Sequence, residues 1–280
     1  MTEQLSGVPQ ALSPLVRRVL APNPSPYTHT GTQSYLIGDA HVAVIDPGPD
    51  RPEHVEALVA AIGGARVAAI LCTHTHRDHS PAAVPLAAAT GAPVVGCATI
   101  ASEGRSFDRT YAPDRVLGDG ERLEGDGWTL EAVATPGHVP NHLCFALREE
   151  QALFTGDHVM GWSTTVIAPP EGDMGAFMAS LDRLLGRDDR VYYPAHGDPV
   201  DNPHQLVRAQ GGHRHQRERQ ILRLVAAGAS DVATMVAEMY KGLDPRLTGA
   251  AEASVLAHLI DLERRGLVAG EGAQWRRRAA

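Results

Sequence analysis

The chain contains 280 residues, of which 43% are hydrophobic and 21% are charged, and its net charge is −8. This length accommodates one large domain, or a large domain and a small one, and the apolar fraction excludes wholesale disorder. The negative charge argues against non-specific binding of polyanions. The sequence has no run of about 18 apolar residues, so we expect neither a transmembrane helix nor a membrane partner.

Cysteine usage and the N-terminal composition indicate the cellular compartment. The three cysteines, Cys72, Cys97 and Cys144, lie apart in apolar stretches. An odd, sparse set is typical of reduced thiols in the cytosol rather than of a disulfide framework. Residues 1–18 lack the basic start and the apolar stretch of a signal peptide. We therefore expect a cytoplasmic protein.

The first part of the chain alternates between strand and helix patterns. Strands are predicted over residues 32–38, His41–Ile45, Arg66–Cys72, 93–96, 116–117, Trp128–Ala134, Leu143–Leu147, 152–154 and 190–193. Helices are predicted over Pro52–Ile62 and Met174–Leu185. Ser80-Pro81 is a start signal for a further helix, which Pro85 should kink. Such alternation is typical of a layered α/β domain.

Charge divides the chain near residue 212. Residues 213–280 contain 11 Lys and Arg and 8 Asp and Glu, a balance of +3, which leaves −11 for residues 1–212. Helix patterns cover 214–227, 231–240 and 250–265, with Ser230-Asp231 capping the second, and a hairpin is predicted over 266–275. We therefore predict two domains, 1–212 and 213–280, the second with a winged-helix pattern.

The 14 histidines are clustered, most densely in Thr73-His74-Thr75-His76-Arg77-Asp78-His79. Because side chains alternate along an extended backbone, we expect His74, His76 and Asp78 to point into one pocket. His79 falls where the chain turns and can approach from another side. Imidazole and carboxylate groups are the ligands expected for zinc, and iron or manganese are the alternatives.

Three further ligand-type residues each follow a predicted strand and stand beside a glycine. They are His138 in Pro136-Gly137-His138, Asp157 in Gly156-Asp157, and His196 in His196-Gly197. Strand ends that each offer a ligand-type residue argue against the alternative, a solvated polar loop with unrelated histidines.

These motifs resemble those of the metallo-β-lactamase superfamily, in which H-x-H-x-D-H is followed by a His, an Asp and a last His. The resemblance covers roughly residues 25–200 and implies a four-layer αββα sandwich with its site at one edge. It implies two divalent metal ions, the first held by His74, His76 and His138, the second by Asp78, His79 and His196, with Asp157 bridging them. It also makes Asp46 a supporting residue, for which a turn residue is the alternative.

A closer resemblance is to the lactamase-beta-2-like branch of that superfamily. It is carried by Asn23-Pro24-Ser25-Pro26, Gly156-Asp157 with Thr164-Thr165, and Tyr193-Pro194-Ala195-His196-Gly197. His213-Arg214 and Arg217-Glu218 resemble the start of that branch's winged-helix-like C-terminal domain. The resemblance therefore extends over nearly the whole chain.

The chemistry implied is hydrolysis by a hydroxide bound to both metal ions, with Asp78 as the catalytic residue that orients it or moves a proton. His142 is predicted to support the site or contact substrate, with a surface histidine as the alternative. Thr164 and Thr165 are predicted at the mouth of the site, with a plain turn as the alternative.

The bond cleaved stays open among ester, thioester, lactone and phosphodiester. One alternative is an endoribonuclease selective for single strands, and another is a non-hydrolytic binding or regulatory protein with a vestigial metal site. A small molecule or single-stranded RNA is thus the expected substrate, while the mixed charge of the tail argues against duplex DNA. The oligomeric state stays open, with a dimer as one option.

Overall fold

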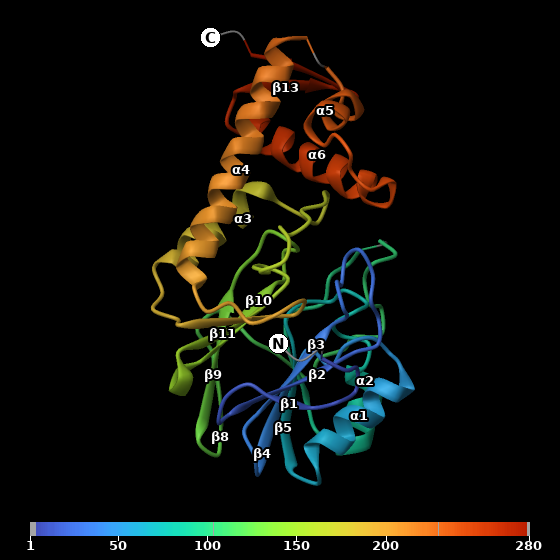
Figure 1. Ribbon diagram of the computed structural model, residues 1–280, viewed down its shortest axis with the longest axis vertical. Helices are drawn as coiled ribbons and strands as arrows, with labels where there is room; N and C mark the ends of the chain where they lie inside the picture. The colour runs from blue at the N-terminus through green and yellow to red at the C-terminus, as the bar shows by residue number, and fades with distance from the viewer. Residues whose placement is uncertain (1–3, 103, 229, 279–280) are drawn as a thin grey trace. The chain divides into compact units, whose positions relative to one another are not determined.

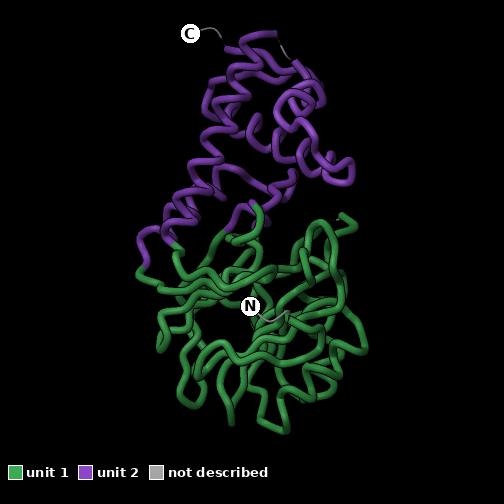
Figure 2. Tube along the Cα trace, viewed as in Figure 1, with its two compact units in different colours: residues 1–135, 141–163, 188–203 green, residues 136–140, 164–187, 204–280 purple. Residues whose placement is uncertain are grey.

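The computed structural model describes residues 4–102, 104–228 and 230–278, and these form two compact units (Figure 2). The first unit comprises the described residues within 1–135, 141–163 and 188–203. The second comprises those within 136–140, 164–187 and 204–280.

The first unit contains a seven-stranded sheet with its strands in chain order. Its strands are β1 (Gln10–Ala11), β2 (Val16–Leu20), β3 (Gln33–Ile37), β4 (His41–Ile45), β5 (Arg66–Cys72), β6 (Val94–Gly96) and β7 (Arg115–Val116). Helices α1 (Pro52–Ile62) and α2 (Ala83–Thr90) connect β4 to β5 and β5 to β6, and both of these strand pairs are parallel (Figure 1).

A five-stranded sheet faces the first one and has the order β12-β11-β10-β9-β8. Its strands are β8 (Arg122–Gly125), β9 (Trp128–Ala134), β10 (Leu143–Leu147), β11 (Ala152–Gly156) and β12 (Val191–Pro194), and the 3-10 helix η1 (Arg148–Glu150) joins β10 to β11. One apolar core includes residues of both sheets, among them Leu36, Ile70 and Phe145. The indole N–H of Trp128 donates to the carbonyl oxygen of His41 at 2.7 Å and so links the two sheets.

The second unit is mainly helical. It contains α3 (Met174–Leu185), α4 (Pro203–Ala226), α5 (Val232–Met239), the 3-10 helix η2 (Pro245–Leu247), α6 (Thr248–Arg264) and the hairpin of β13 (Val268–Glu271) and β14 (Gln274–Arg277). Ile221, Leu259 and Trp275 belong to its own apolar core. The three helices α4, α5 and α6 with the terminal hairpin match the predicted winged-helix pattern.

The layered α/β prediction is confirmed, and α1, β5, β9, β10 and α3 have the predicted ends. The start of α2 was predicted wrongly at Ser80-Pro81, because residues 80–82 form a turn and the helix begins at Ala83. Pro85 consequently lies in the first turn, where its missing N–H would have had no helical partner, and no kink is required.

The predicted division between residues 212 and 213 falls inside α4, which continues through Gly211 and Gly212. A buried stripe at helical spacing explains the continuity: Val207, Gln210, Arg214, Ile221 and Val225 are all buried. The residues expected to begin a helix at 214 are therefore the second half of a longer one. The assignment of functional domains to these ranges stays a prediction.

Strands β1, β2 and β8 were not predicted. Arg17 and Arg18 interrupt the apolar pattern of β2, although Arg18 is only 4% exposed. Strand β1 has two residues, and β8 lies at a sheet edge with a largely exposed face. Short and edge strands carry little hydrophobic periodicity, which is the signal that a strand prediction needs.

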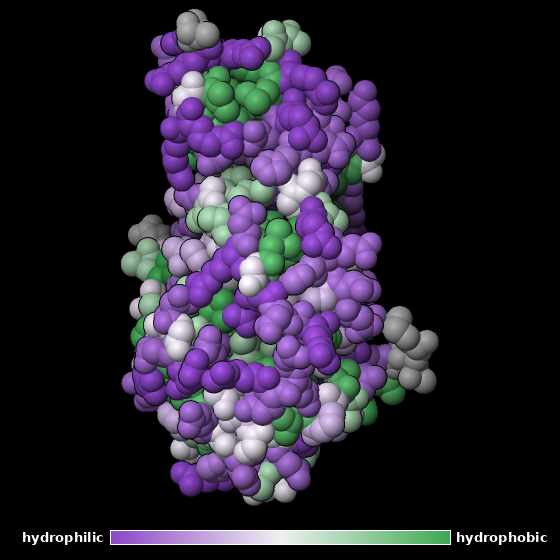
Figure 3. All heavy atoms as spheres, turned by 90° about the vertical axis from the view of Figure 1, so that its left-hand side faces the viewer, coloured by the Kyte–Doolittle hydropathy of each residue, from purple (hydrophilic) through white to green (hydrophobic). Residues whose placement is uncertain are grey.

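The three cysteines are free and buried, and the cytoplasmic location stays a prediction. Within the described ranges, none of the helices combines the length and the apolar character needed to cross a membrane. The face shown in Figure 3 is mostly hydrophilic, with small apolar areas scattered over it.

Buried His54 makes stability depend on pH. Its side chain is fully buried beside the Ser34 hydroxyl, and burial lowers the pKa of His54 from 6.5 to about 4. As the pH falls, His54 is therefore protonated in the unfolded chain before it is protonated in the folded chain. The stabilisation that comes from neutral His54 is complete above pH 6.5 and is lost as the pH falls from 6.5 to 4. The loss should reach about 3 kcal/mol of the free energy of unfolding.

Urea unfolding of chelator-treated protein between pH 7 and 4 measures this effect. His54→Gln should flatten the pH dependence, whereas His215→Gln, a change at an exposed helix position, should leave it unchanged. An equal slope in the His54 variant would contradict the assignment.

Candidate metal centre

The candidate ligands of the first unit lie where strands end at one edge of the two sheets. Strands β4 and β5 run parallel, as do β11 and β12, so the carboxyl ends within each pair lie together. Asp46 follows β4, the segment 73–79 follows β5, Asp157 follows β11, and His196 follows β12. The predicted gathering of strand ends thus places these side chains near one another.

Asp46 connects the first hairpin to the histidine segment. One of its carboxylate oxygens accepts the Thr73 backbone N–H at 2.8 Å, and the other accepts the Thr73 hydroxyl at 2.8 Å. The second oxygen also lies 2.9 Å from Nδ1 of His79. Asp46 is 2% exposed and has a positive φ of 50°, so the chain adopts an unfavourable backbone conformation to direct this carboxylate inward.

In both His79 and His196, one ring nitrogen faces a hydrogen-bond acceptor and the other has no hydrogen-bond partner in the part of the chain that the structure describes. Nδ1 of His79 faces Asp46, and Nδ1 of His196 lies 3.2 Å from the carbonyl oxygen of Gly31. Each Nδ1 can donate to its oxygen, which leaves Nε2 as the lone-pair nitrogen. Among the described residues, neither buried Nε2 atom has a hydrogen-bond partner.

The two Nε2 atoms converge on carboxylate oxygens. His196 Nε2 lies 3.3 Å from an oxygen of Asp78 and 3.3 Å from Oδ1 of Asp157. The corresponding distances from His79 Nε2 are 3.6 Å and 3.5 Å. The ligand atoms of Asp78, His79 and His196 all lie within 4.8 Å of one another. This is a compact set of nitrogen and oxygen donors around one point.

A second set comprises His74, His76 and Asp157, whose ligand atoms also lie within 4.8 Å of one another. Nε2 of His74 is 2.9 Å from Nδ1 of His76, and Nδ1 of His74 is 3.0 Å from the Thr73 hydroxyl oxygen. Because that hydroxyl donates to Asp46, it can accept from His74 and so direct Nε2 of His74 toward His76. Asp157 belongs to this set, and its Oδ1 also lies 3.5 Å from His79 Nε2 and 3.3 Å from His196 Nε2 of the other set.

The common pocket expected for His74, His76 and Asp78 stays a prediction, but the strand alternation from which it was argued does not reach Asp78. The ligand atom of Asp78 lies with those of His79 and His196, the grouping that the resemblance implied. The extended backbone ends with β5, and the chain turns at His76, whose carbonyl oxygen accepts the His79 N–H at 3.0 Å. Residues in a turn do not follow the two-residue period of a strand.

The electrostatics of this set favour a cation. Burial alone would raise the pKa of Asp78, but the charges of His79 and His196 hold it well below its usual range. Burial lowers the pKa of His79, yet the charges of Asp78 and Asp157 outweigh it and raise that pKa well above 6.5. Asp78 therefore stays ionised, and positive charge is stabilised at the imidazole of His79.

His142 supports the loop that carries Asp157. It is 1% exposed, so the surface alternative was wrong. Its Nε2 accepts the Asp157 backbone N–H at 3.2 Å, and its Nδ1 lies 2.8 Å from the Thr135 hydroxyl oxygen. A contact between His142 and substrate stays a prediction.

His138, Thr164 and Thr165 belong to the second unit. Nδ1 of His138 lies 2.7 Å from the carbonyl oxygen of Val166, which leaves Nε2 as its ligand atom if Nδ1 donates. Thr165 is buried and Thr164 is half-buried. Their predicted places, as a metal ligand and at the mouth of the site, stay predictions.

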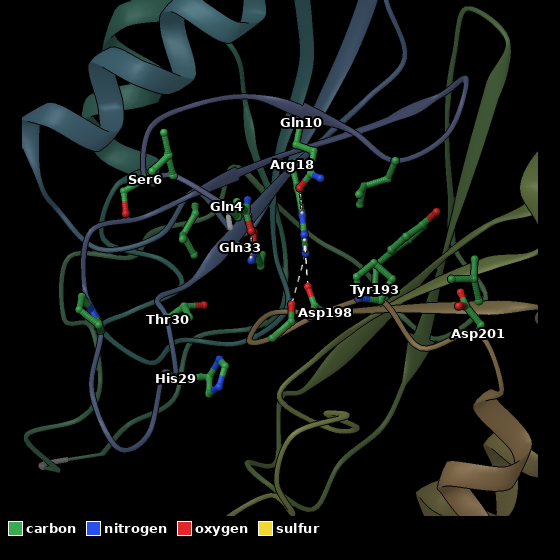
Figure 4. A pocket seen from close by; sticks show the side chains of 17 residues that line it. Gln4, Ser6, Gln10, Arg18, His29, Thr30, Gln33, Tyr193, Asp198 and Asp201 are labelled. Atoms are coloured by element: carbon green, nitrogen blue, oxygen red, sulfur yellow. Dashed lines mark hydrogen bonds and ion pairs between the residues drawn. The ribbon is translucent and has the colours of Figure 1, made fainter. Parts of the chain in front are cut away.

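A cavity of about 870 Å³ lies beside the segment that follows His196 (Figure 4). The buried Arg18 reaches across it and donates to the Gly197 carbonyl oxygen and to Asp198, both at 3.4 Å, and to Gln10 at 2.9 Å. Arg18 was not predicted as a site residue, and its signal in the sequence is a pair of arginines within a short apolar stretch. It anchors the residues directly after His196 to β2.

A family model described as the metallo-beta-lactamase superfamily matches residues 27–196. The chain belongs to the metallo-beta-lactamase superfamily. A second model, described as the beta-lactamase associated winged helix domain, matches residues 232–275. This superfamily member is thus an enzyme of hydrolase type with a C-terminal winged-helix domain, as the resemblance implied.

Curated relatives carry hydrolase names. An atrochrysone carboxyl ACP thioesterase of Aspergillus fumigatus is 36% identical over 217 residues, which cover 75% of this chain and 65% of that protein. The match thus spans slightly less than two thirds of that relative's length. The beta-lactamase-like protein 2 homolog of Caenorhabditis elegans is 33% identical over 232 residues, covering 77% of this chain and 72% of that protein.

Solved structures share the fold. A metallo-beta-lactamase family protein of Thermus thermophilus has a TM-score of 0.79 at 25% identity, covering 96% of this chain and 100% of its own. A beta-lactamase domain protein from Burkholderia ambifaria has a TM-score of 0.83 at 19% identity, covering 99% and 95%. The protein TTHA1623, in a di-iron-bound form, has a TM-score of 0.54 at 29% identity, covering 67% and 96%.

The residues present fit divalent metal ions. Buried imidazole nitrogens of His79 and His196 lie against the carboxylates of Asp78 and Asp157, and a divalent cation would be bound by both kinds of group at once. Histidine and carboxylate donors without thiolates are the ligand chemistry of zinc, iron and manganese sites.

Replacing Asp46 with Asn should weaken zinc binding by about 10- to 100-fold, because the amide removes the charge that orients His79 and, through Thr73, His74. Zinc titration in competition with a chromophoric chelator measures this change. The exposed Asp50→Asn in the same loop is the matched control and should bind as the unaltered chain does. A folded Asp46 variant with unaltered zinc affinity would exclude this supporting role.

Proposed function

We propose that this chain hydrolyses acyl thioesters with the help of two divalent metal ions. His74, His76 and His138 would hold the first ion, Asp78, His79 and His196 would hold the second, and Asp157 would serve both. The observation that carries the proposal is the pair of buried Nε2 atoms, on His79 and His196, that lack hydrogen bonds and lie 3.3–3.6 Å from the carboxylates of Asp78 and Asp157.

Zinc is the first expectation for both positions, with iron or manganese as alternatives. Mixed imidazole and carboxylate ligands suit all three metals, and here the described ligands include no thiolate. The di-iron-bound form of TTHA1623, a 29% identical protein, supports iron as an alternative.

When bound, two divalent ions supply Lewis acidity that polarises a carbonyl and lowers the pKa of water. The chain contributes a base beside them. Asp78 is ionised and its side chain is 28% exposed, so its carboxylate can accept a hydrogen bond from the attacking water and take its proton. As water adds to the acyl carbon, the carbon–sulfur bond breaks and the leaving thiolate is protonated.

A covalent mechanism through cysteine is disfavoured by burial. Cys72 and Cys97 are 0% and 1% exposed. Burial raises the pKa of Cys97 to about 12 and that of Cys72 well above its usual value, so neither is a thiolate at neutral pH. Direct attack by water therefore suits this chain better.

Two observations favour a thioester over RNA. Relatives that are 36% and 31% identical are named atrochrysone carboxyl ACP thioesterase. The charge of −11 over residues 1–212 also repels a long polyanion, which needs cationic groups along its path. Single-stranded RNA is accordingly the comparison substrate in the test.

The test compares thiol release from an acyl-pantetheine thioester with cleavage of single-stranded RNA, using purified full-length chain. We expect thiol release that a chelator abolishes and that added zinc, manganese or iron restores. RNA cleavage without thiol release would overturn the thioester assignment in favour of an endoribonuclease. A chain that holds well under one metal per molecule would favour a non-hydrolytic protein.

Asp78→Asn should lower kcat for the thioester by about 100-fold or more, because asparagine keeps the shape of the side chain but cannot take a proton. Metal content measured on the same sample separates loss of the base from loss of the ion. The exposed Asp39→Asn is the control. Full turnover with full metal occupancy in the Asp78 variant would refute this role.

A further inference from the structure

Arg214 is a buried cation with an unusual set of partners. It lies within α4, is 4% exposed, and has no carboxylate partner among the described residues. Its guanidinium donates to the Thr165 carbonyl oxygen, and its central carbon lies 5.2 Å from the centroid of the Phe177 ring. Burial lowers its pKa to about 10, so it stays charged at neutral pH. Removing a charge from water without an acidic partner raises the free energy of the folded chain. An apolar side chain at this position would avoid that desolvation penalty.

The two partners of Arg214, Thr165 and Phe177, both lie near the segment that carries His138. Thr165 precedes Val166, whose carbonyl oxygen lies 2.7 Å from Nδ1 of His138. Holding the Thr165 carbonyl fixes the peptide plane between Thr165 and Val166, which is next to the plane that carries the acceptor of His138.

The second partner, Phe177, fixes the other side of the same segment. Gly137 packs so closely on the start of α3 that a Cβ atom there would lie 2.3 Å from the Phe177 Cα atom. The Gly137 carbonyl accepts the Asp173 N–H at 2.8 Å, and the Pro136 carbonyl accepts the Ser180 hydroxyl at 2.8 Å. The segment 136–138 is thus attached to α3, whose Phe177 ring lies beneath the Arg214 guanidinium.

We infer that Arg214 is a positioning residue for His138, which it orients through Thr165-Val166 and through Phe177. It selects the His138 tautomer that donates from Nδ1 to Val166 and leaves Nε2 for a metal ion. The inference rests on the proposed metal site, and it gives helix α4 a part in that site without any contact to substrate.

The same helix supplies a matched control. Arg217 also donates to a backbone carbonyl, that of Met239 at 3.2 Å, and also lies over an aromatic ring, that of Tyr240 at 4.4 Å. These two partners belong to the end of α5, and Arg217 also donates to His213 at 3.2 Å and to Gln220 at 3.0 Å within its own helix. None of the four is next to His138 in the chain. Arg217→Met therefore removes equivalent contacts from the same helix without disturbing the His138 segment.

The experiment measures zinc affinity of Arg214→Met, Arg214→Lys and Arg217→Met by competition with a chromophoric chelator. We expect Arg214→Met to bind about 10- to 100-fold more weakly, Arg214→Lys to recover part of the loss, and Arg217→Met to stay within about twofold of the unaltered chain. Equal losses in the Arg214 and Arg217 methionine variants, or no loss in the former, would overturn the inference.

A second readout needs no metal. Long-range ¹⁵N spectra of histidine rings in chelator-treated protein, assigned with His138→Asn, report which ring nitrogen of His138 carries the proton. The unaltered chain should show protonation at Nδ1, and Arg214→Met should show a mixture of tautomers. An unchanged tautomer in Arg214→Met refutes the positioning role, whereas absence of zinc binding by the unaltered chain refutes the proposed metal site instead.

Discussion

The carboxylate of Asp46 is the interaction on which the candidate centre depends. It is almost completely buried at the end of β4, where the backbone has a left-handed φ of 50°, a conformation that costs of order 1–3 kcal/mol for such a residue. Hydrogen bonds to Thr73 and His79 offset this cost and the cost of desolvation. The backbone strain thus serves to fix one residue of each donor set, His79 directly and His74 through Thr73.

Three arginines of the second unit make contacts inside it. Arg214 and Arg217 bind backbone carbonyls and lie over aromatic rings, and Arg265 pairs with Glu218 at 2.7 Å. Other arginines of this unit, such as Arg219, Arg223 and Arg276, are exposed. The expectation that the tail does not read duplex DNA therefore rests on its mixed charge.

Much of the fold could be predicted where the sequence carries strong local signals. The ends of α1 follow from Pro52 at its start and Gly63 after it, β10 is a uniformly apolar run, and β5 is apolar after Arg66. The errors have local causes as well. Ser80-Pro81 has the composition of a helix start but forms a turn, and Gly211-Gly212 has that of a linker but lies inside a helix with a continuous buried stripe.

For the site, the sequence by itself determined the chemistry available: imidazoles and carboxylates spaced within one segment and repeated after later strands, a set that suits divalent metal ions and excludes a thiolate centre. Only the tertiary structure shows the physical reason for the division of the donors, because the turn at His76 moves Asp78 to the side of His79 and His196. It also decided that His142 supports the Asp157 loop and that Arg214 holds the partners of the His138 segment. Spacing along the chain fixes which residues are close in sequence, whereas the hydrogen-bond partner of a side chain comes from distant segments that only folding brings together.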